Sequence, residues 1–344
     1  MRSSFVPNLR LGRPSWEAAC MSGGFRLFQH RLRLPVIGSP LFIVSCPELV
    51  IEQCKAGIVG SFPALNARTP ELLTAWIERI KAELATAEAA GKRPAPFAVN
   101  QICHASNSRL RTDLAICVEQ RVPIVITSLQ VSKEVIDAVH SYGGKVLHDV
   151  ISLRHAQKAI EYGVDGLIPV CAGAGGHAGT LSPFALVREL RAVFAGPIAL
   201  SGAIADGSSV LGALAMGADF AYMGTRFIAT AEANASAEYK RMLAESSASD
   251  IIYSNLFTGV HGNYLAPSIK AAGLDPHALP ASDKSAMNFG SSSKGGNTGA
   301  KAWKDIWGSG QGVGTITDAP KVSELVDRLE REFVDAQARL KSKL

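Results

Sequence analysis

Short apolar segments, rich in β-branched residues, alternate with segments of helical periodicity from residue 34 onward. Most of the apolar segments are nearly continuous runs, which is typical of strands that are buried on both faces of a parallel sheet. The pattern predicts eight such strands, at residues 34–44, 57–62, 96–102, 122–128, 144–150, 163–171, 196–201 and 218–224.

Helix-start signals lie between these strands. Thr69, Ser132 and Asp206 each precede a segment in which apolar residues recur at helical spacing, and all three are residue types that cap helix N-termini. Eight strand–helix repeats are the pattern of a (β/α)8 TIM barrel. The rival fold, an open dinucleotide-binding sheet, would carry a GxGxxG loop after its first strand, where this chain has Ser39-Pro40-Leu41. We therefore predict an α/β protein with a TIM barrel.

The repeat also predicts the domain organisation. The barrel is expected at 34–230, a small helical and loop subdomain over the barrel mouth at 231–315, and a C-terminal helix packed on the barrel at 316–344. Residues 1–33 are expected to form a disordered or poorly ordered leader. Apolar residues at i, i+3 and i+4 spacing predict the last helix, namely Val322, Leu325, Val326, Leu329 and Phe333.

The composition, with 47% hydrophobic and 19% charged residues, excludes an intrinsically disordered chain. The net charge of +5 resides in residues 1–33, which hold six of the 35 basic residues and one of the 30 acidic residues, so that the remaining 29 of each kind balance. A nucleic-acid partner is therefore disfavoured, because it would need basic residues clustered on the folded domain.

The leader resembles a transit peptide in being Arg-rich and poor in acidic residues. Pro7, Gly12 and Pro14 would interrupt an amphipathic helix, so an unstructured tail, or a translation start assigned upstream of Met21, is favoured. No apolar run approaches the roughly 18 residues of a membrane span. The six cysteines lack CxxC spacing, which disfavours a metal site and a disulfide scaffold. A soluble protein in the reducing cytoplasm is the expected setting.

Three loops follow predicted strand ends, where TIM barrels carry their active sites. The sixth strand is followed by CAGAGGHAGT at 171–180, in which His177 is the titratable side chain of a glycine-rich loop. The seventh and eighth strands end in SGAIADG at 201–207 and MGTRF at 223–227. Backbone N–H groups in these two turns, the Thr225 hydroxyl and the Arg226 charge predict a phosphate site, unless Arg226 faces away and pairs with an acid.

The motifs PVIGSPL, AGAGGHAG, SGAIADG, ALAMGADFAYMGTRF and WGSGQGVG follow one another in this order. In this combination the chain resembles the nitronate monooxygenase family, formerly called 2-nitropropane dioxygenases, over residues 34–340. The resemblance implies an FMN-containing barrel that oxidises alkyl nitronates with O₂ to carbonyl compounds and nitrite. A homodimer is compatible with it.

The resemblance also implies roles for individual residues. His177 matches the catalytic histidine, and Leu41 stands where the family often has Met. In place of a Lys that some members carry after the fifth strand, this chain has His148-Asp149, so that contact stays open. The residues implied to contact the flavin ring, ribityl chain or phosphate are Ser39, Pro40, Leu41, Asn100, Gly175, Gly176, Ser201, Gly202, Ala203, Met223, Gly224 and Thr225.

Chemistry and resemblance indicate one mechanism. A nitroalkane becomes an anionic nitronate by losing an α-proton, and a histidine with an ordinary pKa near ~6.5 takes that proton or, when protonated, holds the anion. The nearest alternative is an FMN- and NAD(P)H-dependent reductase of enoyl thioesters or quinones. A third hypothesis is a flavin-free barrel like inosine monophosphate dehydrogenase, with Cys171 as nucleophile.

Overall fold

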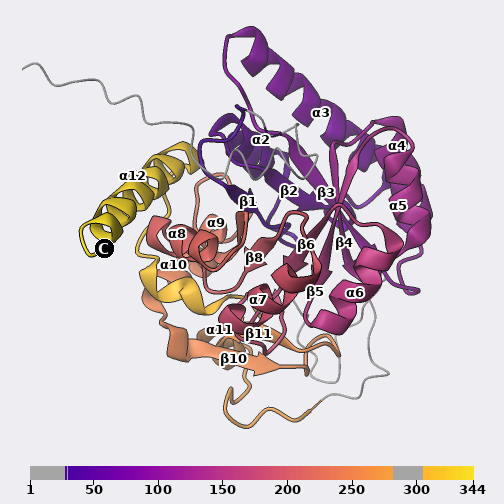
Figure 1. Cartoon of the computed structure of the whole chain (residues 1–344). Coiled ribbons are helices and arrows are strands. Elements are labelled where there is room, and N and C mark those ends of the chain that lie inside the picture. The colour runs from indigo at the N-terminus through magenta and orange to yellow at the C-terminus, as the bar shows by residue number, and fades with distance from the viewer. Residues whose placement is uncertain (1–27, 29, 282–304) are drawn as a thin grey trace, which may run out of the picture.

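Eight parallel strands form the centre of the molecule (Figure 1). The computed structural model describes residues 28, 30–281 and 305–344. Each of these strands overlaps one of the eight predicted segments. They are β1 Val36–Gly38, β2 Gly60–Pro63, β3 Phe97–Cys103, β4 Ile124–Leu129, β5 Lys145–Val150, β6 Gly166–Pro169, β8 Ala199–Ser201 and β9 Phe220–Met223.

The strands close into a ring. One sheet has the order β2-β3-β4-β5-β6 and another the order β1-β9-β8. Isolated parallel bridges join the two sheets at both seams, Ile37 with Val59 at one, and Leu167 with Ile198 and Val170 with Ser201 at the other. The cyclic order is therefore β1-β2-β3-β4-β5-β6-β8-β9, and the predicted TIM barrel is confirmed.

Helices cover the outside of the ring (Figure 1). Thr69, Ser132 and Asp206 cap three of them through their side chains, as their residue types predict. The helices between the strands are α2 Pro47–Lys55, α3 Pro70–Ala89, α4 Leu110–Glu119, α5 Lys133–His140, α6 Leu153–Tyr162, α7 Pro183–Val193 and α8 Gly207–Ala215, with a short 3-10 turn η2 at Ala64–Asn66.

The folded part begins before residue 34, where the sequence analysis placed its start. Phe28 and Leu32 are 2% and 8% exposed and join the same buried cluster as Ile37 and Phe220. The Phe28 ring lies 5.1 Å from that of Phe220. Packing against the barrel interior thus extends to Phe28 and Leu32, which the sequence analysis assigned to the leader. Met21 and the rest of the leader lie outside the described residues.

The chain after β9 covers the glycine-rich loop. Here β10 and β11 form an antiparallel sheet with β7, which lies within that loop. The sequence analysis expected helices and loops in this region and missed these two strands. The elements are β7 Gly176–His177, α9 Thr225–Ile228, α10 Ala237–Glu245, η3 Ala248–Asp250, β10 Ile251–Ser254, β11 Gly262–Leu265, α11 Ala266–Ala271 and η5 Gln311–Thr315.

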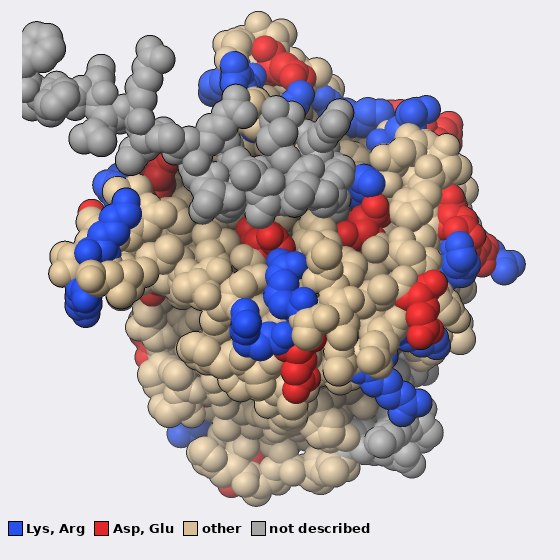
Figure 2. Space-filling view, in the orientation of Figure 1, with Lys and Arg blue, Asp and Glu red and all other residues tan. Residues whose placement is uncertain are grey.

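The last helix, α12 Val322–Lys341, packs against α8 and α2. It buries all five apolar residues that predicted it. Figure 2 shows acidic and basic side chains interspersed on the described part of one face, with no continuous basic patch there. Among the described helices, none combines the length and apolarity that a membrane crossing requires.

Candidate active site

A cavity of about 500 Å³ lies at the carboxyl ends of the barrel strands. It gathers residues from or directly after all eight barrel strands, which are far apart in the sequence. Met223 does not line it, because its side chain is fully buried in the core. The other predicted site residues all do: Ser39, Pro40, Leu41, Asn100, Gly175, Gly176, His177, Ser201, Gly202, Ala203, Gly224 and Thr225.

One side of the cavity, which we call the glycine cradle, consists of Gly175, Gly202, Gly224, Thr225 and Gly310. A Cβ atom at Gly224 would lie 2.5 Å from Ser39 Oγ, and one at Gly175 would lie 2.8 Å from Gly310 N. Thr225 Oγ1 accepts a hydrogen bond from Gly310 N at 2.9 Å. Gly310 belongs to the late WGSGQGVG motif, so the cradle is completed by a segment distant in sequence.

Arg226 does not enter the cavity. Its guanidinium donates to the Asp318 carboxylate and to the Asp318 backbone oxygen, at 2.9 and 3.1 Å. Asp318 also accepts two hydrogen bonds from Arg328. The cradle therefore has backbone donors and a hydroxyl on its surface, while the neighbouring cation anchors α9 to the segment before α12.

The loop after β1 is held in a strained conformation at the cavity rim. Ile43 has φ +67°, which is costly for a β-branched residue. The buried Asn66 accepts from Ile43 N at 2.9 Å and donates to the backbone oxygens of Leu41 and Ser45 at 3.0 and 2.8 Å. Asn66 therefore fixes Leu41 against the cavity, and sequence reasoning did not single it out.

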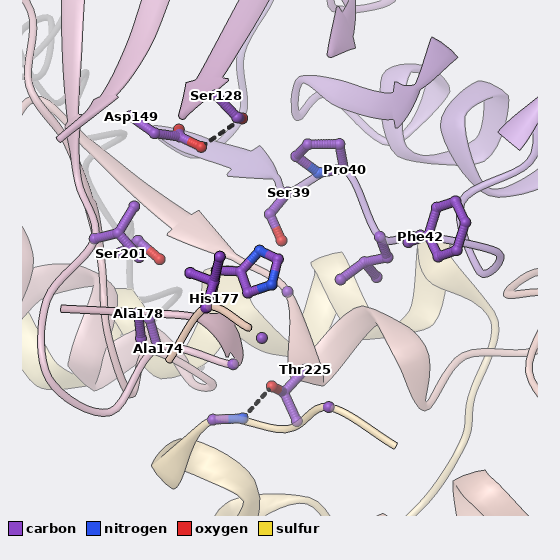
Figure 3. A pocket seen from close by; sticks show the side chains of 18 of the residues that line it. Ser39, Pro40, Phe42, Ser128, Asp149, Ala174, His177, Ala178, Ser201 and Thr225 are labelled. Carbon is purple, nitrogen blue, oxygen red and sulfur yellow. Dashed lines mark hydrogen bonds between the residues drawn. The ribbon is translucent and has the colours of Figure 1, made fainter. Parts of the chain in front are cut away.

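His177 points into the cavity between the two sides (Figure 3). Its Nε2 lies 3.0 Å from Thr258 Oγ1. Because Thr258 donates its proton to the Val260 oxygen at 3.0 Å, it accepts from His177, and the lone pair of the neutral ring is on Nδ1. Burial lowers the pKa of His177 to about 4, below the ordinary value on which the sequence analysis rested. The imidazole is therefore neutral at pH 7.

The opposite side of the cavity carries three linked polar side chains, which we call the polar row. Asn100 Nδ2 donates to Ser128 Oγ at 2.7 Å, and Ser128 Oγ donates to Asp149 Oδ2 at 2.6 Å. Burial raises the pKa of Asp149 to about 7. The sequence analysis named Asn100 but not Ser128, and it left the role of Asp149 open.

His148 belongs to the barrel core. Its Nδ1 lies 2.8 Å from Thr127 Oγ1, and burial lowers its pKa to about 4. It does not line the cavity, whereas Asp149 does. Alternation along β5 thus places His148 on the outer face, with Val146 and Val150, and Asp149 on the inner face, with Leu147.

Comparison with known proteins agrees with this geometry. A family model described as nitronate monooxygenase matches residues 28–332. The chain is 28% identical to the nitronate monooxygenase of Paraburkholderia phytofirmans, over 87% of this chain and 92% of that protein. It is also 28% identical to (3aS,4S,5R,7aS)-5-hydroxy-7a-methyl-1-oxo-octahydro-1H-indene-4-carboxyl-CoA dehydrogenase of Rhodococcus jostii, over 58% of this chain and 53% of that one.

Among solved structures, the nitroalkane oxidase of Streptomyces ansochromogenes matches with a TM-score of 0.74 at 22% identity, over 91% of this chain and 99% of that chain. This likeness shows a shared fold. The family match, by contrast, covers most of the sequence, including the strand-end loops that form the cavity. The chain therefore belongs to the nitronate monooxygenase family of flavin-dependent oxidoreductases.

Proposed function

We propose that the protein binds FMN in this cavity and oxidises alkyl nitronates with O₂ to carbonyl compounds and nitrite. The observation that carries the proposal is a half-buried, neutral imidazole, His177, that faces the same cavity as a glycine cradle. Family membership supports a flavin in general, and the cradle is what favours a phosphate-bearing flavin.

The cavity residues fit FMN. The cradle glycines let neighbouring chain segments approach where a Cβ would collide, and the Thr225 hydroxyl, which accepts from Gly310 N, keeps its own proton to donate to an anion. Ser39, Pro40 and Leu41 line the rim, and Asn66 holds their loop. Asn100 offers an amide across from the cradle. Bound flavin would supply the transfer of electrons from the nitronate to O₂.

His177 acts on the substrate proton in this proposal. A neutral nitroalkane must lose its α-proton, and Nδ1 of the neutral imidazole accepts it, with Thr258 holding the ring through Nε2. The low pKa of His177 favours a role as a neutral base over a role as a permanently charged group that binds the nitronate anion. A nitronate supplied directly has already lost the proton, so it needs only binding and orientation.

The test is to extract the cofactor and to reduce the bound flavin without oxygen. A nitronate that bleaches the flavin, with NAD(P)H inert, supports the proposal. Bleaching by NAD(P)H alone would replace it with the alternative reductase function.

That alternative, an FMN- and NAD(P)H-dependent reductase of enoyl thioesters or quinones, has one observation in its favour. The cavity rim is rich in apolar side chains, including Phe42, Ile151, Leu256 and Phe257, and a relative of similar identity is named for a carboxyl-CoA substrate. The flavin-free hypothesis loses its nucleophile, since Cys171 is fully buried and does not line the cavity.

A further inference from the structure

Asp149 stands apart from the other residues of the cavity because one of its carboxyl oxygens has no partner. Oδ2 accepts from Ser128, whereas Oδ1 is buried without a hydrogen-bond partner among the described residues. Asp149 is also the one carboxyl side chain among the described residues that line the cavity. A buried carboxyl oxygen without a hydrogen-bond partner lowers stability. A polar group of a bound ligand would supply the missing partner of Oδ1.

The order of strands in the barrel places Asp149 across from the glycine cradle. In the ring of eight strands, β4 is four places from β9 and β5 is three places from it, while β5 neighbours β6, whose loop supplies Gly175. The polar row comes from the ends of β3, β4 and β5, and the cradle from loops after β6, β8 and β9. Figure 3 shows Ser128 and Asp149 on one side of His177 and Thr225 on the other.

A ligand held by its phosphate in the cradle extends its other end toward the polar row. In FMN that end is a heterocycle with both N–H and C=O groups. An ionised carboxylate can accept from the N–H group, and a protonated carboxyl group can donate to the C=O group. The hydrogen-bond direction within the row is fixed, because Ser128 donates to Oδ2. A proton on Asp149 therefore resides on Oδ1, the carboxyl oxygen that has no partner among the described residues.

We propose that Asp149 hydrogen-bonds the heterocycle of the bound flavin through Oδ1 and takes up one proton there when the flavin is reduced. The inference rests on the proposed FMN function and adds a proton-coupling residue to it. The balance is simple. Two electrons and one proton entering the flavin leave it with one added negative charge, and Oδ1 of ionised Asp149 takes a second proton from solvent, which removes the charge repulsion. The nitronate supplies the electrons in turnover, and a chemical reductant supplies them in the test.

Other titratable groups near Asp149 do not compete for this role. Cys103 and Tyr222 interact with it electrostatically, and burial raises the pKa of Cys103 to about 12 and that of Tyr222 well above its ordinary value. His148 and His177 have their pKa lowered to about 4. His155 and His261 also line the cavity, and the variants His155→Asn and His261→Asn test whether either of them takes up the proton.

The experiment measures the midpoint potential of the bound flavin from about pH 6 to pH 9, where the slope reports protons taken up per two electrons. In the wild type we expect one proton at the acidic end and two at the alkaline end. Asp149→Asn keeps the size and the Ser128 contact but cannot ionise, and we expect one proton throughout. The control variants His155→Asn, His177→Asn and His261→Asn should keep the wild-type slopes.

Ser128→Ala provides a second test that leaves Asp149 in place. It removes the donor that favours the carboxylate, so the change from one to two protons should move to higher pH. The same slopes in wild type and Asp149→Asn would overturn the proposal, as would a change of slope that disappears with a histidine instead. If Asp149→Asn binds no flavin, the Ser128→Ala shift decides alone. Absence of flavin from the wild type would reject the proposed function itself, whereas unaltered slopes reject only this role of Asp149.

Discussion

The two sides of the cavity are built from different materials. The glycine cradle presents backbone and one hydroxyl, and it is closed by chain packing so tight that a Cβ at Gly224 or Gly175 would collide with its neighbours. The polar row presents three side chains joined by hydrogen bonds. A surface of backbone groups recognises shape and charge at any pH, whereas a row that ends in a carboxyl group responds to pH. In the proposed function, the cradle would hold the phosphate end of the flavin, and the polar row would make the interaction with its other end depend on pH.

The largest expected effect is the loss of flavin binding when the glycine cradle is disrupted. Gly224→Asp places a carboxylate and a Cβ against Ser39 and the phosphate site, so the protein should fold but purify without flavin. The matched control is Gly212→Asp, which adds the same charge at a position with nothing within 4 Å of its Cβ. Flavin content is measured by absorbance and folding by circular dichroism. Full flavin content in Gly224→Asp would remove the cradle from cofactor binding.

The next prediction concerns His177, which lies between the two sides. His177→Asn should keep the flavin, because the cradle and not the imidazole holds it. Turnover of a neutral nitroalkane should then fall by about 10²–10⁴-fold, the usual contribution of a positioned acid–base group. Turnover of a pre-formed nitronate should fall less. Both substrates are measured on both proteins.

Equal losses on the two substrates would mean that His177 orients the substrate rather than accepting its proton. No loss on either would take this residue out of the mechanism.

A smaller effect is expected at the rim. Asn66→Ala removes three hydrogen bonds to the strained loop and should lower the free energy of unfolding by about 1–3 kcal/mol while weakening flavin binding. Asn234→Ala is the control, since Asn234 donates to the same residue, Ile43, from an exposed position. Urea unfolding and flavin titration compare the two. A larger loss of stability in Asn234→Ala than in Asn66→Ala would show that the hydrogen bonds of Asn66 are not what holds the loop.

The smallest effect is in the pH profile. Because burial lowers the pKa of His177 to about 4, its basic form is complete above that pH and is lost only as the pH falls through about 4. In Asp149→Asn, kcat/KM for a nitroalkane should therefore be flat between about pH 5 and pH 9. A wild-type change near pH 7 that is absent from this variant belongs to Asp149, whose pKa burial raises to about 7. A change that persists there would assign an ordinary pKa to His177.

Much of the barrel could be predicted from the sequence because its signals are local. Continuous apolar runs located all eight barrel strands, and single capping residues such as Thr69 and Ser132 located helix starts. The strand-end loops indicated five of the predicted site residues, namely His177, Gly202, Ala203, Gly224 and Thr225, since in this fold the strand ends converge on one mouth. The other eight came from the family resemblance. Phe28 and Leu32 were missed because they precede the first predicted strand in an Arg-rich segment that resembles a leader.

The remaining site residues depend on contacts between distant segments. Thr258 meets His177 across 81 residues, and Asn66 meets Leu41 across 25. No local pattern marks such partners, and β10 and β11 lie in a region where the strand–helix repeat that located the barrel strands has ended. The low pKa of His177 likewise follows from burial by these distant segments and not from the loop's own sequence.

The bond between Thr225 and Gly310 spans 85 residues, and this has a consequence for the order of events during synthesis. A chain leaving the ribosome at about 5–20 residues per second has all eight barrel strands roughly 4–17 s before the residue that closes the cradle. Over that interval the nascent chain contains the residues of the polar row and of the histidine loop, but it lacks Gly310, which completes the glycine cradle. If the cradle holds FMN as proposed, cofactor binding is expected only after the ribosome has passed residue 310.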